Sequence, residues 1–199
     1  MGARSRQVKM MKASVTRAAE GFDRRSFTVK EVLRMQETGI ISDDENFELI
    51  EGEIVPMQAK THVHELIKSA LNIGLARALP DPLWLGVEST MYLSKSTFVE
   101  PDFVIYRRGI KLEEVKGTDI VLAIEVAVTS LAYDRGLKAQ LYARHGVREL
   151  WVIDANQRRA HIHTGPKKAG AWEHIVERGP DDFLTCDALP GFSAKLGTI

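Results

Sequence analysis

The stretch VLAIEVAVTS, residues 121–130, decides the fold, because it combines a buried-strand pattern with a single charged residue. The apolar residues on both sides of Glu125 form a run that is typical of a strand covered on both faces. An ionised carboxylate in such a strand loses hydration that its surroundings must replace. A metal ion, a lysine, or a strand end that reaches solvent could each replace it.

Outward from this strand, helical and extended patterns alternate along the chain. Thr28 or Ser26 can cap a first helix, and Glu31 completes a capping box with Thr28. Helices are predicted at 26–36, 62–79 and about 133–144, and strands at 47–57 (two pieces around a turn at Gly52), 83–93, 101–106, 149–154 and 158–165, with short strands in the last thirty residues. This order predicts an α/β or α+β fold with a mixed central sheet flanked by helices.

Length and composition indicate one globular domain. The chain has 199 residues, of which 44% are hydrophobic and 27% charged, close to ordinary globular values. Residues 1–25 hold seven basic and two acidic groups, although the net charge of the chain is zero. We therefore expect a basic, flexible N-terminal arm at 1–25 and a single domain at 26–199. The arm either contacts nucleic acid or a membrane surface or is simply solvated.

Cysteine content and hydropathy bear on the compartment. Cys186 is the single cysteine, which excludes an intrachain disulfide and fits a reducing compartment. No base lies near it in sequence, so we expect an inert thiol. There is no apolar run of ~18 residues and no secretory signal. The expectation is a cytoplasmic protein that does not span a membrane.

Four charged residues are candidates for chemistry. Asp102 begins the apolar strand FVIY, Glu125 interrupts its own strand, Glu48 opens LIEGEIV, and Lys138 lies on the helix that follows. If the strands of Asp102 and Glu125 are neighbours, their carboxylates can converge on a hard divalent cation such as Mg²⁺, with Mn²⁺ as a substitute. Lys138 would then orient a water molecule or stabilise a developing oxyanion.

Each of these residues also has a purely structural interpretation. Asp102 after a proline suits a turn, and Glu125 could pair with an arginine in a buried bridge. Asp134 and Lys138 are spaced as a solvated helix salt bridge. Tyr142, four residues further on, could be core, and Glu48 lies in an acidic cluster of the kind that is usually exposed.

The histidines and the standard sequence motifs give little further evidence for a functional site. His161 and His163 would share one face of a strand and could bind zinc, but no third ligand is evident. There is no CxxC pair, no phosphate-binding glycine loop and no nucleophile elbow. Nucleotide-binding loops and serine hydrolases are therefore unsupported.

Taken together, several segments resemble the Uma-two family of restriction-endonuclease-like proteins, within the PD-(D/E)XK nuclease superfamily. The resemblance covers about residues 27–165. It is carried by FELIEGEIVPM, His64, VEPDFVIY, DIVLAIEVAVTS and YDRGLKAQLYARHGVRELWVID, with Glu125, Asp134, Lys138, Tyr142, Gly146, Val147, Trp151 and Asp154 at the family's spacing.

The resemblance implies a restriction-endonuclease-like fold and assigns roles to five residues. Asp102 would be the motif aspartate and Glu125 the acidic residue of the last motif. Glu48 would reach the metal directly or through water, and His64 would help to position phosphate or water. The lysine usual two residues after Glu125 is replaced by Ala127, a position where family members also carry an apolar residue, which makes Lys138 its substitute.

The chain also departs from the family in two loops. Val128 and Thr129 replace the serine and proline that often follow the last strand, and Gln58, Ala59 and Lys60 replace a serine-proline-proline segment. These changes affect loop geometry and substrate choice.

Three functions follow as hypotheses. The first is a Mg²⁺-dependent endonuclease that hydrolyses DNA phosphodiester bonds with a metal-activated water, acting as a homodimer. The second is a noncatalytic, homodimeric module that binds nucleic acid or protein, which the absent lysine at position 127 and the near-neutral charge favour. The third is a metal-dependent hydrolase of small phosphoesters.

Overall fold

A computed structural model describes residues 23–199. Its centre is a six-stranded sheet with the order β10-β9-β8-β7-β6-β3. These strands are β3 (Leu83–Val87), β6 (Phe103–Arg107), β7 (Ile120–Ala127), β8 (Glu149–Asp154), β9 (Arg159–Pro166) and β10 (Trp172–Arg178). Only β7 and β8 pair in parallel, while the other neighbours are antiparallel. The mixed central sheet that the sequence predicts is confirmed.

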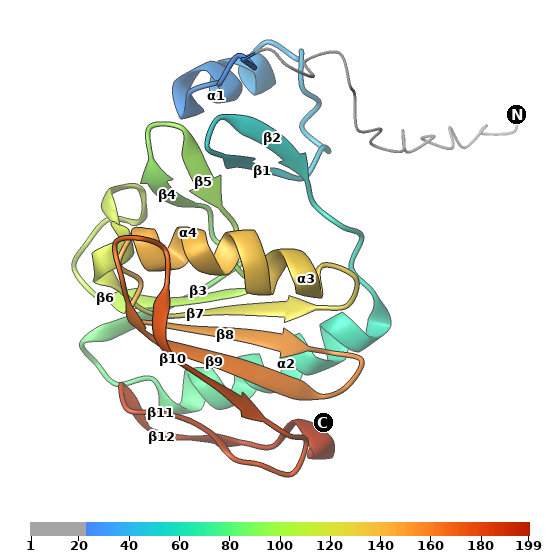
Figure 1. Ribbon diagram of the computed structural model, residues 1–199, viewed down its shortest axis with the longest axis vertical. Helices are drawn as coiled ribbons and strands as arrows, with labels where there is room; N and C mark the ends of the chain where they lie inside the picture. The colour runs from blue at the N-terminus through green and yellow to red at the C-terminus, as the bar shows by residue number, and fades with distance from the viewer. Residues whose placement is uncertain (1–22) are drawn as a thin grey trace, which may run out of the picture.

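Helices cover both faces of this sheet (Figure 1). The helix α2 (His62–Ala78) lies on one face, together with the hairpin of β11 (Leu184–Cys186) and β12 (Leu189–Ala194). The other face carries the crossover that joins the parallel strands β7 and β8. It consists of α3 (Leu131–Tyr133), a π-helical turn (Asp134–Lys138) and α4 (Ala139–Arg144). A parallel pair needs such a crossover because its strands run in the same direction.

A second, four-stranded sheet with the order β2-β1-β5-β4 packs above α4 (Figure 1). Its strands are β1 (Phe47–Ile50), β2 (Glu53–Pro56), β4 (Met91–Ser94) and β5 (Thr97–Val99), and α1 (Val29–Glu37) packs beside it. Three short 3₁₀ turns complete the chain at Leu112–Glu114, Gly117–Asp119 and Leu196–Thr198.

Local signals explain several of these elements. Thr28 caps α1 and forms the predicted capping box with Glu31. In the β1–β2 turn, Glu51 and Gly52 both have positive φ, 52° and 88°, as tight hairpin turns require. A Cβ at Gly52 would lie 2.5 Å from the Cβ of Ser26, so the turn also needs glycine for close packing.

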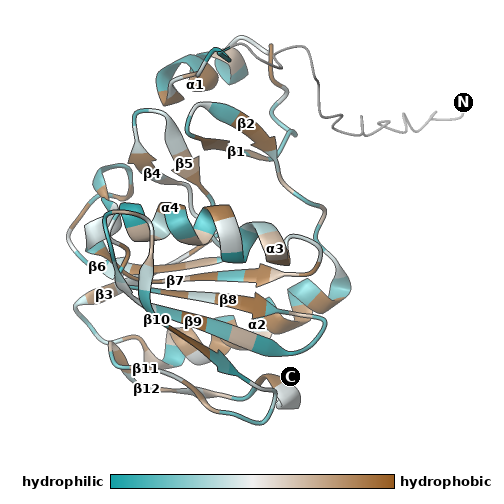
Figure 2. Cartoon of the chain, viewed as in Figure 1, coloured by the Kyte–Doolittle hydropathy of each residue, from teal (hydrophilic) through white to brown (hydrophobic). Residues whose placement is uncertain are grey.

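The core forms on both faces of β7, whose eight residues are all buried. Figure 2 shows β7 as a mostly hydrophobic strand with a hydrophilic interruption. The face toward α2 packs Ile124 and Phe103 against Leu71. The face toward α4 packs Ala123 against Leu141.

Two predicted elements differ from the structure. The single strand expected at 83–93 is two strands, β3 and β4, which belong to different sheets. The chain turns between them at Glu88, whose φ is 48°, a value that interrupts extended backbone. The helix expected at about 133–144 contains the π-helical turn, and β5 was not predicted as a separate strand.

The predicted arm at 1–25 lies outside the described residues, except for its last three. The single domain at 26–199 stays a prediction. None of the helices within 23–199 is long and apolar enough to cross a membrane.

Candidate functional site

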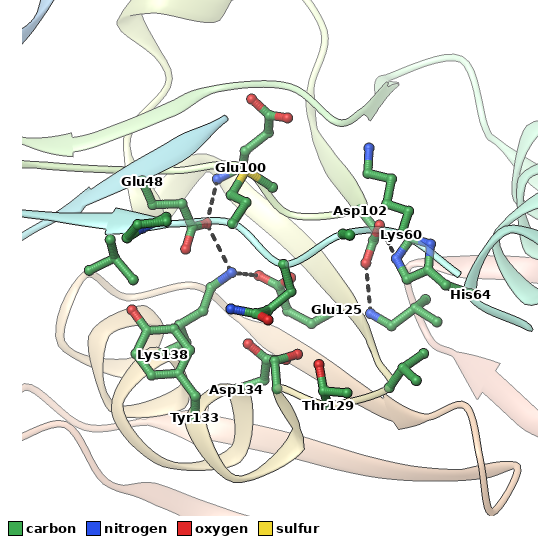
Figure 3. Close-up of a pocket in the computed structure, with 18 of the residues that line it drawn as sticks. Glu48, Lys60, His64, Glu100, Asp102, Glu125, Thr129, Tyr133, Asp134 and Lys138 are labelled. Atoms are coloured by element: carbon green, nitrogen blue, oxygen red, sulfur yellow. Dashed lines mark hydrogen bonds and ion pairs between the residues drawn. The ribbon is translucent and has the colours of Figure 1, made fainter. Parts of the chain in front are cut away.

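A cavity of about 430 Å³ opens between the second sheet, the crossover and the first turn of α2. All five residues that the sequence singles out, Glu48, His64, Asp102, Glu125 and Lys138, line it (Figure 3). They come from five separate parts of the chain. The structure therefore gathers the predicted set around one cavity.

Strand register explains why Asp102 and Glu125 line the same cavity. The antiparallel pairing of β6 with β7 places Phe103 opposite Ile124, so one step further puts Asp102 opposite Glu125. The side chains of such opposed residues point to the same face of a sheet. The backbone N–H of Val126 donates to Oδ2 of Asp102 at 2.8 Å, which fixes one edge of this carboxylate.

Lys138 joins two of the acids. Its Nζ lies 2.9 Å from Oε1 of Glu48 and 2.8 Å from Oε1 of Glu125. Oε1 of Glu48 also accepts from the backbone N–H of Glu100 at 2.8 Å. Glu48, Glu125 and Lys138 are each no more than 5% exposed, so this ion-pair network is buried and only weakly screened.

Burial governs the protonation of this network. Burial raises the pKa of Glu125 to about 8, although the ammonium of Lys138 opposes the shift. Burial also disfavours the charged form of Lys138, but Glu125 and Glu48 outweigh this effect and raise its pKa. Tyr142, which is fully buried on α4, donates to Oε1 of Glu125 at 2.5 Å. Lys138 is thus held as an ammonium between two carboxyl groups.

His64 and Asp102 form the other side of the cavity. His64 lies in the first turn of α2, where Thr61 caps the helix by accepting from the His64 backbone N–H. Nε2 of His64 is 2.9 Å from Oδ1 of Asp102. Burial lowers the pKa of His64, but its hydrogen bond with Asp102 and the charge of that carboxylate outweigh burial and raise it.

The purely structural interpretations fit only in part. Tyr142 does belong to the core, and Asp102 does lie in a bend, but those of Glu125 and Glu48 do not fit. Glu125 pairs with Lys138 and not with an arginine, and Glu48 is buried although its sequence neighbours are acidic. Asp134 accepts from the hydroxyl of Ser130 at 2.5 Å, while Lys138 turns to Glu48 and Glu125. The expected Asp134–Lys138 helix salt bridge is therefore wrong, because the buried acids on two other strands offer Lys138 better partners.

Among the other residues that line the cavity, three that the sequence did not single out as site residues have raised pKa values. Burial raises the pKa of the Glu100 carboxyl and raises the pKa of Tyr133 to about 12. Asp134 is buried, and burial raises its pKa as well. Glu100 lies only two residues before Asp102, which is a signal that could have found it. Tyr133 has no comparable signal, because its position depends on where the crossover begins.

The donor set suits a hard divalent cation held by few protein ligands. Carboxylate oxygens are the ligands that Mg²⁺ prefers, and one or two suffice when waters complete the octahedron. Within residues 23–199, no three His, Cys, Asp or Glu side chains converge closely enough to enclose a metal ion. A cation nevertheless already lies between Glu48 and Glu125, namely the ammonium of Lys138. The residues fit a water-rich site on Asp102 and Glu125 better than an enclosed cage.

The remaining candidates lie outside the cavity. His161 and His163 are buried on β9, where Nδ1 of His163 is 3.0 Å from the carbonyl oxygen of His161. A zinc site there finds no third ligand in the described part of the chain. Burial raises the pKa of Cys186 to about 12, in agreement with the expected inert thiol.

The fold and the cavity together define an α+β protein of the restriction-endonuclease-like class. The model of the Uma2 family, described as "Putative restriction endonuclease", matches residues 29–197. The chain belongs to this family. A crystal structure described as "a putative nuclease belonging to DUF820 from Anabaena variabilis ATCC 29413" is similar in fold, with a TM-score of 0.64 and 14% identity over 86% of this chain and 96% of that one. A comparison with curated proteins finds no match.

Proposed function

We propose that the protein is a metal-dependent endonuclease that hydrolyses phosphodiester bonds of DNA. The observation that carries this proposal is the convergence of Glu48, Asp102, Glu125 and Lys138 on one cavity. The family's description as restriction endonucleases supports the same reaction class.

The charge of the cavity gives a physical reason for metal dependence. Five carboxyl groups line it, against the two ammonium groups of Lys60 and Lys138. Such a surplus of acids repels a phosphodiester at these short distances. Added cations would therefore be needed before DNA can approach.

Asp102 and Glu125 would hold the ion, with Glu48 as a direct or water-mediated ligand. A bound Mg²⁺ supplies positive charge that acidifies water and stabilises the negative charge developing on phosphate oxygens. Lys138 keeps its proton and can donate it as a hydrogen bond to a reacting oxygen. Asp102 orients His64 toward the cavity, where its imidazole can exchange a proton with water or substrate.

The test is cleavage of plasmid and oligonucleotide DNA with Mg²⁺ or Mn²⁺. We expect Asp102→Asn and Glu125→Gln to lower the rate at least about 100-fold, as the loss of an essential electrostatic contact does. Glu113→Gln, on an exposed 3₁₀ turn, is the matched control and should cleave normally. Equal rates for all four proteins would identify a contaminant and refute the proposal. Chromogenic phosphodiesters assayed in parallel would reveal a small-phosphoester hydrolase instead.

One observation favours a noncatalytic binding module. The ammonium of Lys138 already binds both Glu48 and Glu125, and a metal ion would have to compete with it. Calorimetry with Mg²⁺ and Mn²⁺ separates the two functions. Metal binding that is lost in Glu125→Gln supports the nuclease, while absence of metal binding supports the module.

A homodimer is a further part of the proposal, because an enzyme that cuts both strands of a duplex commonly uses two sites. Analytical ultracentrifugation of the full chain tests it. A single species at the monomer mass of 22.2 kDa across the micromolar range would refute it.

A further inference from the structure

Two lysines beside the cavity converge on a single carboxylate oxygen. The ammonium groups of Lys60 and Lys68 both bind Oε1 of Glu88. Lys60 lies on the segment between β2 and α2 and lines the cavity (Figure 3). Lys68 lies on α2, four residues after His64 and thus on the same side of the helix. A carboxylate oxygen therefore occupies a point where two cations meet next to the candidate site.

Lys68 is unusually enclosed for a lysine. Its side chain is only 12% exposed, whereas lysines are almost never buried without a charged partner. Nζ of Lys68 also lies 2.9 Å from Oε1 of Glu65, a residue whose side chain is 46% exposed. The enclosed ammonium thus depends on Glu88 as its inner partner.

Glu88 itself is held in an unfavourable backbone conformation. Its φ of 48° lies in the left-handed region, which costs a non-glycine residue about 1 kcal/mol or more. Its backbone N–H donates to the carbonyl oxygen of Asp102 at 3.1 Å, so Glu88 lies directly across from that residue on the adjacent strand. Strained residues of this kind cluster at ligand-binding sites.

We propose that Lys60 and Lys68 form a subsite for a phosphate that flanks the scissile one, and that Glu88 occupies this subsite until a nucleic-acid strand displaces it. This inference rests on the proposed function, because it assumes a nucleic-acid substrate. Adjacent strands lie about 5 Å apart, which is on the scale of the separation between successive phosphates of one strand. A phosphate at Asp102 would thus bring its neighbour to the position of the Glu88 carboxylate.

The proposal predicts opposite effects for the carboxylate and for the lysines. Glu88→Gln removes the competing charge, so we expect it to bind a single-stranded oligonucleotide about 5-fold more tightly at low salt. Lys60→Gln should weaken binding and reduce the slope of log affinity against log salt by about 0.7. A residue pair that only clamps the β3–β4 turn to α2 would instead lose stability in Glu88→Gln without any gain in affinity.

Fluorescence anisotropy in EDTA measures these affinities without cleavage. Glu113→Gln and Lys168→Gln make the same charge changes at exposed positions and serve as matched controls. Equal affinities of Glu88→Gln and Glu113→Gln, or no binding by either, would overturn the inference. If Glu88→Gln does not fold, the test rests on Lys60→Gln, because Lys60 lies on an exposed segment. An unchanged salt slope in Lys60→Gln would then overturn the inference.

Failure of the proposed function gives a different pattern. A protein that binds the oligonucleotide with these changes but does not cleave DNA in Mg²⁺ would refute the nuclease and leave the phosphate subsite in place. Cleavage of DNA in Mg²⁺, together with unchanged binding in the variants at positions 60 and 88, would refute the phosphate subsite and leave the nuclease in place.

Discussion

Glu125 and His161 occupy comparable places in the central sheet but have different roles. Glu125 on β7 is opposite Val152 on β8, and Val152 is opposite His161 on β9. The two side chains therefore share one row and one face, two strands and about 10 Å apart. Both are about 5% exposed. Glu125 lines the cavity of the candidate site, and His161 does not.

The two residues differ in how the protein compensates for burying an ionisable group. Burial lowers the pKa of His161 and of His163, so both are held as neutral imidazoles that need no counter-ion. Glu125 instead meets Lys138, Tyr142 and, through Lys138, Glu48. Burial of a polar side chain is thus a weak sign of a site, whereas convergence of opposite charges on a cavity is a strong one.

The largest expected effect comes from removing the cation of the Glu125 network. Lys138→Met removes the buried ammonium that binds both Glu48 and Glu125, so we expect it to lower the free energy of unfolding by about 3–5 kcal/mol. Urea denaturation at pH 7 measures this loss. In addition, Mg²⁺ should raise the melting temperature of Lys138→Met more than that of the wild type, because the ion would replace the ammonium.

Lys168→Met, at an exposed turn position, is the control and should change stability by less than about 0.5 kcal/mol. If Lys138→Met behaved like this control, the ion pairs would contribute nothing, and Glu125 would be no different from His161.

The second prediction concerns the pH dependence of stability. The folded protein raises the pKa of Glu125 from 4.5 to about 8, so folding binds its proton more tightly. This stability is fully present below pH 4.5 and is lost as the pH rises toward 8. The difference in free energy of unfolding between wild type and Glu125→Gln should therefore change by at least about 1 kcal/mol over this interval. His161→Gln should act with the opposite sign, because burial lowers the pKa of His161 from 6.5 and its contribution to stability therefore rises with pH. Equal slopes for wild type and Glu125→Gln would contradict the prediction.

Much of the fold follows from local patterns. The apolar run around Glu125 predicts β7, and the capping box at Thr28 and Glu31 predicts α1. Glu125 could be named as a candidate from its strand alone, because a charged residue buried in an apolar strand needs a compensating partner. The resemblance to a family then linked Asp102, Lys138 and Glu48, which are far apart in sequence.

Other features depend on packing that no local pattern encodes. The predicted strand at 83–93 is divided at Glu88 because β3 and β4 pair in different sheets. This pairing depends on tertiary structure. Likewise, the spacing of Asp134 and Lys138 is that of an ordinary helix pair. Only the buried acids on β1 and β7 draw Lys138 away, and the π-helical turn accompanies this arrangement.

A third, smaller effect is expected at His64. Asp102 raises the pKa of His64 above 6.5 against the effect of burial. The protonated imidazole therefore adds stability that is fully present below pH 6.5 and is lost as the pH rises through the raised pKa. We expect His64→Gln to remove about 1 kcal/mol or less at pH 5.5 and almost nothing at pH 8.5. Denaturation curves at the two pH values measure this difference, and an equal loss at both would mean that His64 acts only through packing.

The smallest effect on stability is expected at Tyr133. It distinguishes a buried hydroxyl that has a hydrogen-bond partner from one that has none. Among the described residues, the hydroxyl of Tyr133 is the buried side-chain polar atom that lacks a hydrogen-bond partner, whereas that of Tyr142 binds Glu125. Tyr142→Phe should cost about 1–3 kcal/mol, since it leaves a buried carboxyl oxygen without this hydrogen bond. The same substitution at Tyr133 should be neutral or stabilise by up to about 1 kcal/mol, because it removes an unsatisfied donor. A clear loss of stability in Tyr133→Phe would mean that an ordered water binds this hydroxyl, which would make it part of the same network as Glu125.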